Sequence, residues 1–437
     1  MDARRPRRCR TPGRCPRGRS AGAPERTVTG LPDEALARVA WSALVEPGDA
    51  VAGSLVQMLG AERSFAFVTD PYIADGAALI AACHAVGTLA DGEQDAFGTA
   101  IRTALERWRP RMGRRTAAQV VEAAAVVGGS LVVPGDPAWP KGVDDLGVHA
   151  PLVLWRRGHG RADDTPVFAR PCLSVVGARS NTLDGAEACA EITSAAADAG
   201  CTTVSGGAYG IDAVAHRVAI AAGAPTVAVL AGGIDQLYPA GHVDLLGNVG
   251  RQGMLLAESP PGTPPTRWRF LARNRLIAAI GNAVVVVEAG ARSGALNTAH
   301  HAAQLGRPVF AVPGRFTSPA SVGCHRLVAE GIAELAVTPR DPIRAAVAGR
   351  TGLLPDEPAL LTSAVEDPDV LRVVDALGRR AVPVAEVAER SGLAIGAATD
   401  ALALAELQGL VHRQSDGWSR RASPGRRGSG AGTARRG

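Results

Sequence analysis

The sequence predicts an α/β protein whose centre is a doubly wound, mostly parallel sheet. Two observations carry this prediction. Between Pro171 and Thr338, short β-branched runs alternate with Ala-rich runs whose apolar residues recur at helical spacing. The segments before and after this stretch show mainly helical spacing. We therefore expect a small helical region before the sheet and a small, mostly helical domain after it.

Six strands are expected in the central domain, which we place at residues 166–345. Each is an apolar run long enough for a buried strand, and most are followed by a helical run. Crossovers between parallel strands are right-handed, so these helices should cover both faces of the sheet. The strand runs are LSVVGA, CTTVSGG, TVAVLAG, GMLLAES, AVVVVEAG and PVFAVPG.

The N-terminal part divides into a tail and a helical region. Residues 1–30 combine Arg, Pro and Gly with few apolar residues, which predicts a disordered basic tail. Residues 31–165 are predicted as a mostly helical region leading into the core. In this region the run RWRPRMGRR (Arg107–Arg115) places five arginines around Trp108. The run fits either contact with nucleic acid or a solvated helix end anchored by one tryptophan.

The C-terminal part is predicted as a linker (346–365), a small domain (366–418) and a second disordered basic tail (419–437). The domain shows three helical runs and a closing hairpin, the pattern of a winged helix-turn-helix. Its helix AIGAATDALALAELQGL contains no Arg or Lys. Because such a helix is poorly suited to a polyanion, we expect the domain to contact protein. Duplex binding through Arg379, Arg380, Arg413 and the basic tail is the alternative.

Charge and cysteine usage exclude several protein classes. The two ends carry net charges of +7 and +6, which leaves −8 for residues 31–418. Lys141, the only lysine, is followed by Gly142, so a Walker-type ATPase is excluded. The seven cysteines form no Cys-x-x-Cys pair, which indicates reduced thiols. With no signal peptide and no 18-residue apolar run, a cytoplasmic protein without membrane contact is expected.

Candidate binding residues follow the first two strands, because doubly wound sheets bind ligands at the carboxyl ends of their strands. Arg179 lies where a dinucleotide fold requires a second glycine, and the second strand ends without the acidic residue that holds a ribose. A nicotinamide dehydrogenase is therefore disfavoured. Ser205, Gly206 and Gly207 end the second strand before a helix, and we expect their amides to form an anion site.

The stretch RWRFLARNRLIAAIGNAVVVVEAG (Arg267–Gly290) places four arginines directly before a buried strand. A helix is expected to begin near Phe270, which puts Arg273 and Arg275 at the same sheet edge as Arg179. Arg267 and Arg269 are interpreted as solvated loop charges. Arginine forks bind phosphates through paired hydrogen bonds, so three arginines beside an amide site indicate a ligand with several phosphates.

The strand AVVVV ends at Glu288, and Ser293 and Gly294 start the next helix. Glu288 is either a catalytic carboxylate or, as we favour, a residue that orients a neighbouring arginine. The sequence contains no catalytic-triad order, metal-ligand spacing or paired-carboxylate motif. We therefore expect neither a metal nor another cofactor.

Six motifs occur in an order and spacing that resembles the DNA-processing protein A family (DprA/Smf), from about Ser130 through Glu334 and more weakly into the winged helix. Leu271, Asp184 and Asn297 depart from the family's usual residues, which limits what the resemblance implies about individual contacts. The motifs are VGARSNTLDG, SGGAYGIDAVAH, LAGGIDQLYPAGH, ESPPGTPPTRWRFLARNRLIA, VVVVEAGARSGALNTA and GRPVFAVPG.

The resemblance implies an extended Rossmann-like fold that binds single-stranded DNA, forms a homodimer and is not an enzyme. It further implies that the protein protects incoming strands and loads the recombinase RecA onto them in natural transformation. Site residues follow from the matched motifs. The implied DNA contacts are Arg179, Arg273, Asn274 and Arg275, with Ser205, Gly206 and Gly207 as an anion pocket and Ser293 and Gly294 beside it.

Two other functions stay open at this point. Glycine-rich Rossmann-like folds with Arg and Glu at strand ends also resemble nucleoside-monophosphate phosphoribohydrolases, in which Glu288 would be the catalytic group. A transcriptional regulator that uses its winged helix is the other. Release of a free base would support the first, and a preference for one duplex sequence would support the second.

Overall fold

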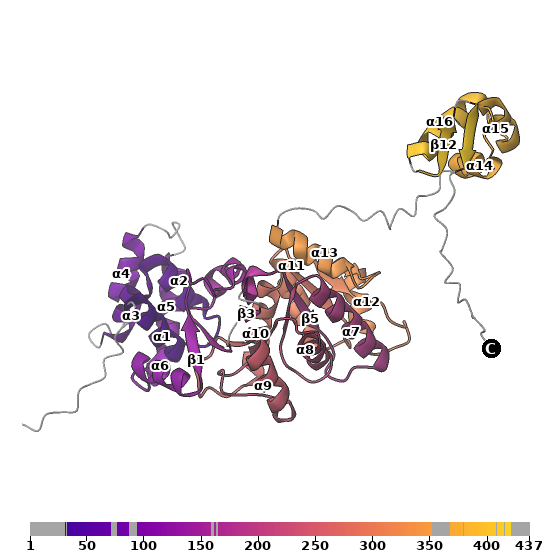
Figure 1. Cartoon of the computed structure of the whole chain (residues 1–437). Helices are drawn as coiled ribbons and strands as arrows, with labels where there is room; N and C mark the ends of the chain where they lie inside the picture. The colour runs from indigo at the N-terminus through magenta and orange to yellow at the C-terminus, as the bar shows by residue number, and fades with distance from the viewer. Residues whose placement is uncertain are drawn as a thin grey trace, which may run out of the picture. The chain divides into compact units, whose positions relative to one another are not determined.

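The computed structural model describes residues 31–420 except residues 32, 71–76, 87–93, 159–160, 163–164, 352–367, 379, 408 and 415. The predicted N-terminal tail lies outside the described residues, as does the C-terminal tail beyond residue 420. The chain divides into two compact units, residues 1–355 and residues 356–437 (Figure 1).

The first unit opens with a helical region that has its own core. Trp41 and Trp108 are buried and meet edge to face, with ring centroids 5.2 Å apart. Leu55 and Ile101 complete the centre of this core. The helices are α1 (Asp33–Leu44), α2 (Ala50–Leu59), α3 (Ala61–Thr69), α4 (Ala77–Ala85), α5 (Gln94–Trp108), the 3-10 turn η1 (Arg109–Arg111) and α6 (Ala117–Val126).

A nine-stranded sheet forms the rest of the first unit, in the order β1-β2-β8-β7-β6-β5-β9-β10-β11. Neighbouring strands from β8 to β11 are parallel, whereas β1 and β2 join the β8 edge antiparallel. The strands are β1 (Gly129–Val132), β2 (Leu154–Arg157), β5 (Cys172–Val176), β6 (Thr202–Ser205), β7 (Thr226–Leu230), β8 (Met254–Ala257), β9 (Ala283–Val286), β10 (Val309–Ala311) and β11 (Glu334–Leu335). A short separate pair consists of β3 (Arg161–Ala162) and β4 (Thr165–Pro166).

Helices cover both faces of this sheet because successive strand residues point to opposite sides. Val175 packs on one face with Ile192 of α7 and Ile211 of α8. Val176 packs on the other face with Leu276 of α10, whose neighbours include α11 and α12. The helices are α7 (Leu183–Asp198), α8 (Ile211–Ala221), α9 (Val243–Gln252), α10 (Arg267–Ile280), α11 (Gly294–Gln304), α12 (Val322–Ala329) and α13 (Asp341–Thr351). The 3-10 segments are η2 (Lys141–His149), η3 (Val167–Ala169) and η4 (Ala240–His242).

The helical region packs directly on one edge of the sheet. Val39 of α1 and Val120 of α6 share a buried cluster with Trp155 of β2 and Leu255 of β8. Figure 1 shows this region beside the α/β layers, joined through β1. The two parts therefore share one continuous core rather than meeting through a linker.

The second unit is a winged helix with a core of its own. Val373, Val387, Leu402 and Trp418 are buried together. Gly392, with φ of 72°, ends the second helix in the left-handed region, which only glycine adopts readily, and turns the chain into the third. The elements are α14 (Pro368–Ala376), α15 (Val384–Ser391), α16 (Ile395–Leu407), β12 (Val411–Gln414) and β13 (Gly417–Arg420).

The predicted fold class is confirmed, and the six expected strands are β5 to β10. Two local predictions were wrong. Helix α10 begins at Arg267 rather than near Phe270, because the Thr266 hydroxyl accepts a hydrogen bond from the Arg269 amide (3.3 Å) and caps the helix. Arg267 and Arg269 are therefore helical. Helix α13 continues to Thr351 and occupies the start of the expected linker, the rest of which lies outside the described residues up to residue 367.

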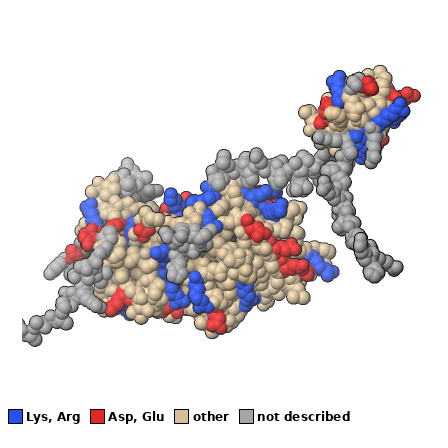
Figure 2. Space-filling model, viewed as in Figure 1, with Lys and Arg blue, Asp and Glu red and all other residues tan. Residues whose placement is uncertain are grey.

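None of the helices in the described parts of the chain is long and apolar enough to span a membrane. Arg, Asp and Glu side chains are interspersed in small groups over the face shown in Figure 2. Basic character at a binding site must therefore come from a local cluster of arginines.

Candidate nucleic-acid interface

A cleft of about 1030 Å³ opens at the carboxyl edge of the parallel strands. It lies where the strand order reverses, because β5 pairs with β6 on one side and β9 on the other, and the loops that follow β5 and β9 diverge. We call it the central cleft. Its lining includes Arg179, Arg267, Phe270, Arg273, Asn274, Arg292, Ser293 and Gly294.

Three exposed arginines line the central cleft from three different elements. Arg179 follows β5, Arg267 lies in the first turn of α10, and Arg292 precedes α11. Within the described residues, none of their guanidinium groups is paired with a carboxylate. Cations held at several points around one cleft suit a ligand that carries several phosphates.

Phe270 forms an aromatic platform beside Arg179 and the buried Arg273. The guanidinium carbons of Arg179 and Arg273 lie 5.4 and 5.8 Å from the centre of its ring. The ring of Tyr238, which is half exposed, lies 5.5 Å from the Phe270 ring and also lines the central cleft. Trp268 is exposed but does not line the cleft.

Arg273 lines the central cleft but is itself buried, with 7% of its surface exposed. Its Nη1 donates to the carbonyl oxygens of Gly206 (2.7 Å) and Val229 (2.6 Å). Gly206 directly follows β6, and Val229 is the last residue but one of β7. Burial lowers the pKa of Arg273 to about 10, opposed by the Asp212 carboxylate, so the guanidinium stays charged near neutrality. Arg273 therefore fixes the exits of β6 and β7, and direct contact with DNA stays a prediction.

The expected anion site at Ser205, Gly206 and Gly207 is filled by the protein's own carboxylate. Asp212 Oδ2 accepts hydrogen bonds from the amides of Gly206 (3.1 Å) and Ala208 (3.3 Å). The Ser205 hydroxyl donates to the Val175 carbonyl oxygen (2.7 Å) and is fully buried. Of the three predicted amides only that of Gly206 is used, together with that of Ala208, and sequence reasoning missed that Asp212, in the first turn of α8, would occupy them.

Gly206 and Gly210 are required by close approach. A Cβ on Gly206 would lie 2.2 Å from Arg273 Nη1. Gly210 has φ of 80°, and a Cβ there would lie 2.1 Å from the Ala178 carbonyl oxygen. Gly206 thus leaves room for the Arg273 guanidinium, and Gly210 lets the loop after β6 pack against the loop that carries Arg179.

Arg275 does not lie at the central cleft, contrary to its expected place beside Arg179. Its side chain is 7% exposed and forms a two-pronged ion pair with Glu258, with both N–O distances at 2.7 Å. Nη2 also donates to the His149 carbonyl oxygen (2.8 Å). All of these partners lie on the side of α10 that faces the helical region. The spacing of Arg273 and Arg275 on one helix explains why they separate, since residues two apart point in different directions.

Glu288 orients a threonine rather than an arginine. Its two carboxylate oxygens accept hydrogen bonds from the amide (2.9 Å) and the hydroxyl (2.6 Å) of Thr182. Thr182 in turn caps α7, since its hydroxyl accepts from the Gly185 amide (3.0 Å). Glu288 thereby holds the end of the loop that begins with Arg179, which agrees with a supporting role.

Asn274 and Ser293 shape the opposite wall of the central cleft. Asn274 Nδ2 donates to the Asn297 side-chain oxygen (3.3 Å) and to the Gly294 carbonyl oxygen (3.4 Å). Ser293 caps α11, with its hydroxyl accepting from the Ala295 amide. The Asn274 contacts tie the middle of α10 to the first turn of α11.

Sequence reasoning missed two of the three exposed arginines. Arg292 belongs to the motif VVVVEAGARSGALNTA. Its position between the end of a strand and the Ser293 helix cap could have identified it as a cleft residue. Arg267 was interpreted as a loop charge because the start of α10 was placed three residues late. The predicted pair Arg273 and Arg275 was selected by residue type, which does not reveal which side of the helix each residue occupies.

Two family models together match most of the chain. Residues 130–346 match the family model described as DNA recombination-mediator protein A, and residues 355–417 match the DprA winged helix domain. The DNA processing protein DprA of Mycobacterium tuberculosis is 44% identical over 307 residues, which cover 67% of this chain and 77% of the relative. DprA of Bacillus subtilis is 32% identical over 232 residues, covering 53% of this chain and 75% of the relative.

A solved structure shows the same arrangement of elements. The X-ray structure of DNA processing protein A from Streptococcus pneumoniae is 26% identical and covers 72% of this chain and 97% of its own, with a TM-score of 0.54. The chain belongs to the DNA processing protein A (DprA/Smf) family.

Proposed function

We propose that this protein binds single-stranded DNA in the central cleft. The observation that carries the proposal is the set of three exposed arginines, Arg179, Arg267 and Arg292, around one cleft. Their guanidinium groups would neutralise backbone phosphates and release condensed counterions, which supplies affinity without sequence preference.

The aromatic side chains favour single strands over duplex. Unpaired bases stack on aromatic rings, whereas bases in a duplex are already stacked on one another. Phe270 and Tyr238 lie in the central cleft beside Arg179, so one strand can place its bases on rings and its phosphates on arginines.

A recombination role follows from family membership and forms part of the same proposal. Relatives are named DNA processing proteins, and the matching family is described as DNA recombination-mediator protein A. We propose that the protein acts as a cytoplasmic homodimer that protects incoming strands and loads RecA onto them in natural transformation.

The proposed role is non-catalytic. Glu288, the candidate catalytic carboxylate of the phosphoribohydrolase alternative, uses both oxygens to hold Thr182 and does not line the central cleft. An assay for free base released from adenosine monophosphate should therefore show no turnover, and turnover lost in Glu288→Gln would favour the hydrolase.

Competition binding tests the proposal. Labelled single-stranded DNA bound to the protein is challenged with unlabelled single strand or with duplex of the same sequence. We expect the single strand to compete at least tenfold better, and Arg267→Ala and Arg292→Ala each to weaken binding several-fold. Equal competition by both forms, with no effect of either variant, would contradict the proposal.

A further inference from the structure

The arginine run Arg107–Arg115 is anchored beside the sheet rather than projecting into solvent. Trp108, at its start, is 2% exposed, and its indole nitrogen donates to Asp49 Oδ2 (3.1 Å). Arg107 pairs with the same carboxylate (3.4 Å). These contacts fix the backbone of the run, so the side chains of its later arginines extend from a fixed position beside the sheet.

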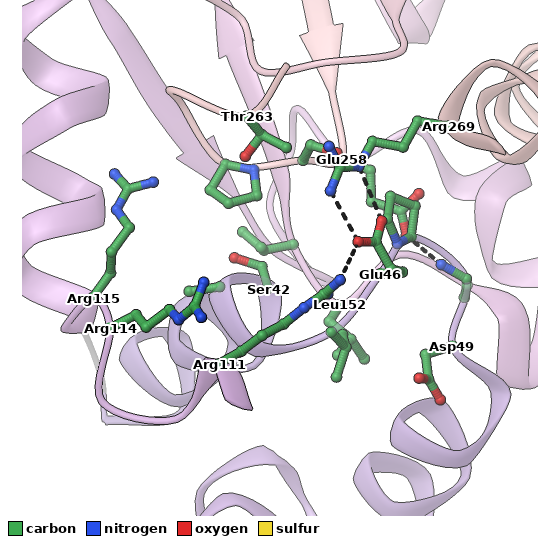
Figure 3. A pocket seen from close by; sticks show the side chains of 18 residues that line it. Ser42, Glu46, Asp49, Arg111, Arg114, Arg115, Leu152, Glu258, Thr263 and Arg269 are labelled. Carbon is green, nitrogen blue, oxygen red and sulfur yellow. Dashed lines mark hydrogen bonds and ion pairs between the residues drawn. The ribbon is translucent and has the colours of Figure 1, made fainter. Parts of the chain in front are cut away.

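Arg111, Arg114 and Arg115 of this run line a cavity of about 230 Å³ between the helical region and the sheet. Figure 3 shows Arg111, Arg114 and Arg115 extending towards it from one side and Arg269 from the other, with Glu46 between them. Ser42 and Thr263 add hydroxyl groups to the lining. We call this cavity the arginine pocket.

The acidic groups of the arginine pocket are already engaged. Glu46 accepts from Arg111 (2.6 Å) and from Arg269 through both of its oxygens (2.9 Å each). Burial alone would raise the pKa of Glu46, but the hydrogen bonds from Arg269 and Arg111 lower it overall, so the carboxylate stays ionised. Glu258 and Asp49, which also line the pocket, pair with Arg275 and Arg107 outside its lining.

Positive charge is left over at the mouth of the pocket. Arg114 is exposed, and within the described residues its guanidinium group has no hydrogen bond or ion pair. Arg115 uses one nitrogen to donate to the Pro261 carbonyl oxygen (2.7 Å) and has no carboxylate partner among the described residues. Two arginines beside two hydroxyls form a suitable site for one phosphate group.

The arginine pocket and the central cleft lie on either side of one helical turn. Arg267 lines the cleft and Arg269 lines the pocket, although both belong to the first turn of α10. The preceding segment divides in the same way, with Thr263 in the pocket and Pro265 in the cleft. A helix with its side chains is about 10–12 Å across, a distance that a few nucleotides of a single strand can span.

We propose that the arginine pocket is a second phosphate subsite, where a strand leaving the central cleft crosses the start of α10 and places a backbone phosphate on Arg114 and Arg115. This inference rests on the proposed function of the cleft. It extends the path of the bound strand onto the helical region. It also gives a function to the Arg107–Arg115 run, which does not line the central cleft.

Strand length and one substitution test the inference. Binding is measured for oligothymidines of about 5 and about 20 nucleotides, because single-strand sites of this kind take about 4–16 nucleotides. Arg114→Ala should weaken binding of the long oligonucleotide about three- to tenfold and reduce the slope of log affinity against log salt by about 0.7. Binding of the short oligonucleotide should stay unchanged. Arg114→Lys should restore part of the loss. Arg102→Ala, which removes an exposed charge from α5, is the matched control and should change neither.

The outcomes separate the subsite from the function. If Arg114→Ala behaves like Arg102→Ala while Arg179→Ala weakens both lengths, the subsite is overturned and the cleft stands. If Arg179→Ala and Arg114→Ala both leave both lengths unchanged, the proposed function and the subsite fail together. If Arg114→Ala abolishes binding of inorganic phosphate in calorimetry but leaves the long oligonucleotide unaffected, the pocket takes a free anion and the strand path is overturned.

Discussion

Arg275 and Glu258 face each other in a two-pronged ion pair, with Nη1–Oε2 and Nη2–Oε1 distances of 2.7 Å. The pair joins the middle of α10 to the end of β8. Glu258 Oε1 also accepts from the Gly48 amide (3.0 Å) in the loop before α2. One ion pair thus ties the helical region, the sheet and the helix that carries Arg267 and Arg273 into one frame.

Removing Arg275 should destabilise the protein rather than remove a DNA contact. Because Glu258 would be left buried without its partner, we expect Arg275→Ala to lower the free energy of unfolding by about 3–5 kcal/mol. Urea unfolding measures this. Arg326→Ala, which breaks an exposed pair with Glu330, is the matched control and should destabilise the protein far less. Equal losses in the two variants would show that the Glu258 pair is not a special clamp.

Thr182 should matter for both stability and strand binding. Thr182→Ala removes the cap of α7 and the hydroxyl bond to Glu288, so we expect a loss of about 1–2 kcal/mol. The loop that starts at Arg179 also loses an anchor, and strand affinity should fall several-fold. Thr116→Ala is a matched control, because Thr116 caps α6 away from the central cleft. If both variants lose stability but neither loses affinity, the Glu288–Thr182 contact does not support the binding loop.

Acid should destabilise the first unit through His216. This side chain is fully buried, and its Nδ1 lies 2.8 Å from the Thr226 hydroxyl oxygen. Burial, with His242 and Arg273 nearby, lowers the pKa of His216 from 6.5 to about 3. Between these two values the unfolded chain binds the proton that the folded protein does not. Stability should therefore fall as the pH drops below 6.5, by up to about 1.4 kcal/mol per pH unit from this group.

Urea unfolding at pH 7, 6 and 5 measures that contribution. His216→Gln cannot titrate, so its free energy of unfolding should fall less steeply with acid than that of the wild type. Identical slopes would show that His216 is not the group responsible.

The winged helix should be dispensable for strand binding. It has its own core, and the described residues of α16 include no Arg or Lys. To exclude the arginine-rich ends, residues 31–355 are compared with residues 31–420. The shorter chain should bind single strands within about twofold of the longer one, and the longer one should gain no salt-sensitive affinity for duplex. Strong duplex binding that disappears with the truncation would assign DNA recognition to this unit.

Particular residues show how far the sequence could predict this structure. The buried strands β5 to β10 are continuous apolar runs between turn residues, so the local sequence pattern was enough to predict them. The short strands β1 and β2 were missed because β1 pairs only with β2, and β8, the other partner of β2, is distant in sequence. The position of Arg179 could be predicted for the same reason as the strands, since this residue follows a strand end.

Contacts between distant side chains could not be predicted in the same way. Nothing in the sequence shows that Asp212 fills the amides after β6, or that Glu258 claims Arg275. Each depends on the direction of one side chain on a helix whose packing is fixed by the whole core. The Glu46 contacts with Arg111 and Arg269 depend further on how the helical region docks.

The salt dependence of single-strand binding tests the central claim most directly. The chain is shortened to residues 31–420, because the arginine-rich ends could bind DNA nonspecifically. For three to five phosphate contacts, log affinity against log salt should have a slope of roughly −2 to −3.5. The variant with Arg179→Ala, Arg267→Ala and Arg292→Ala should flatten the slope by about 2 and lose affinity, while Arg102→Ala changes neither. An unchanged slope and affinity in the triple variant would contradict the assignment of the central cleft as the DNA-binding site.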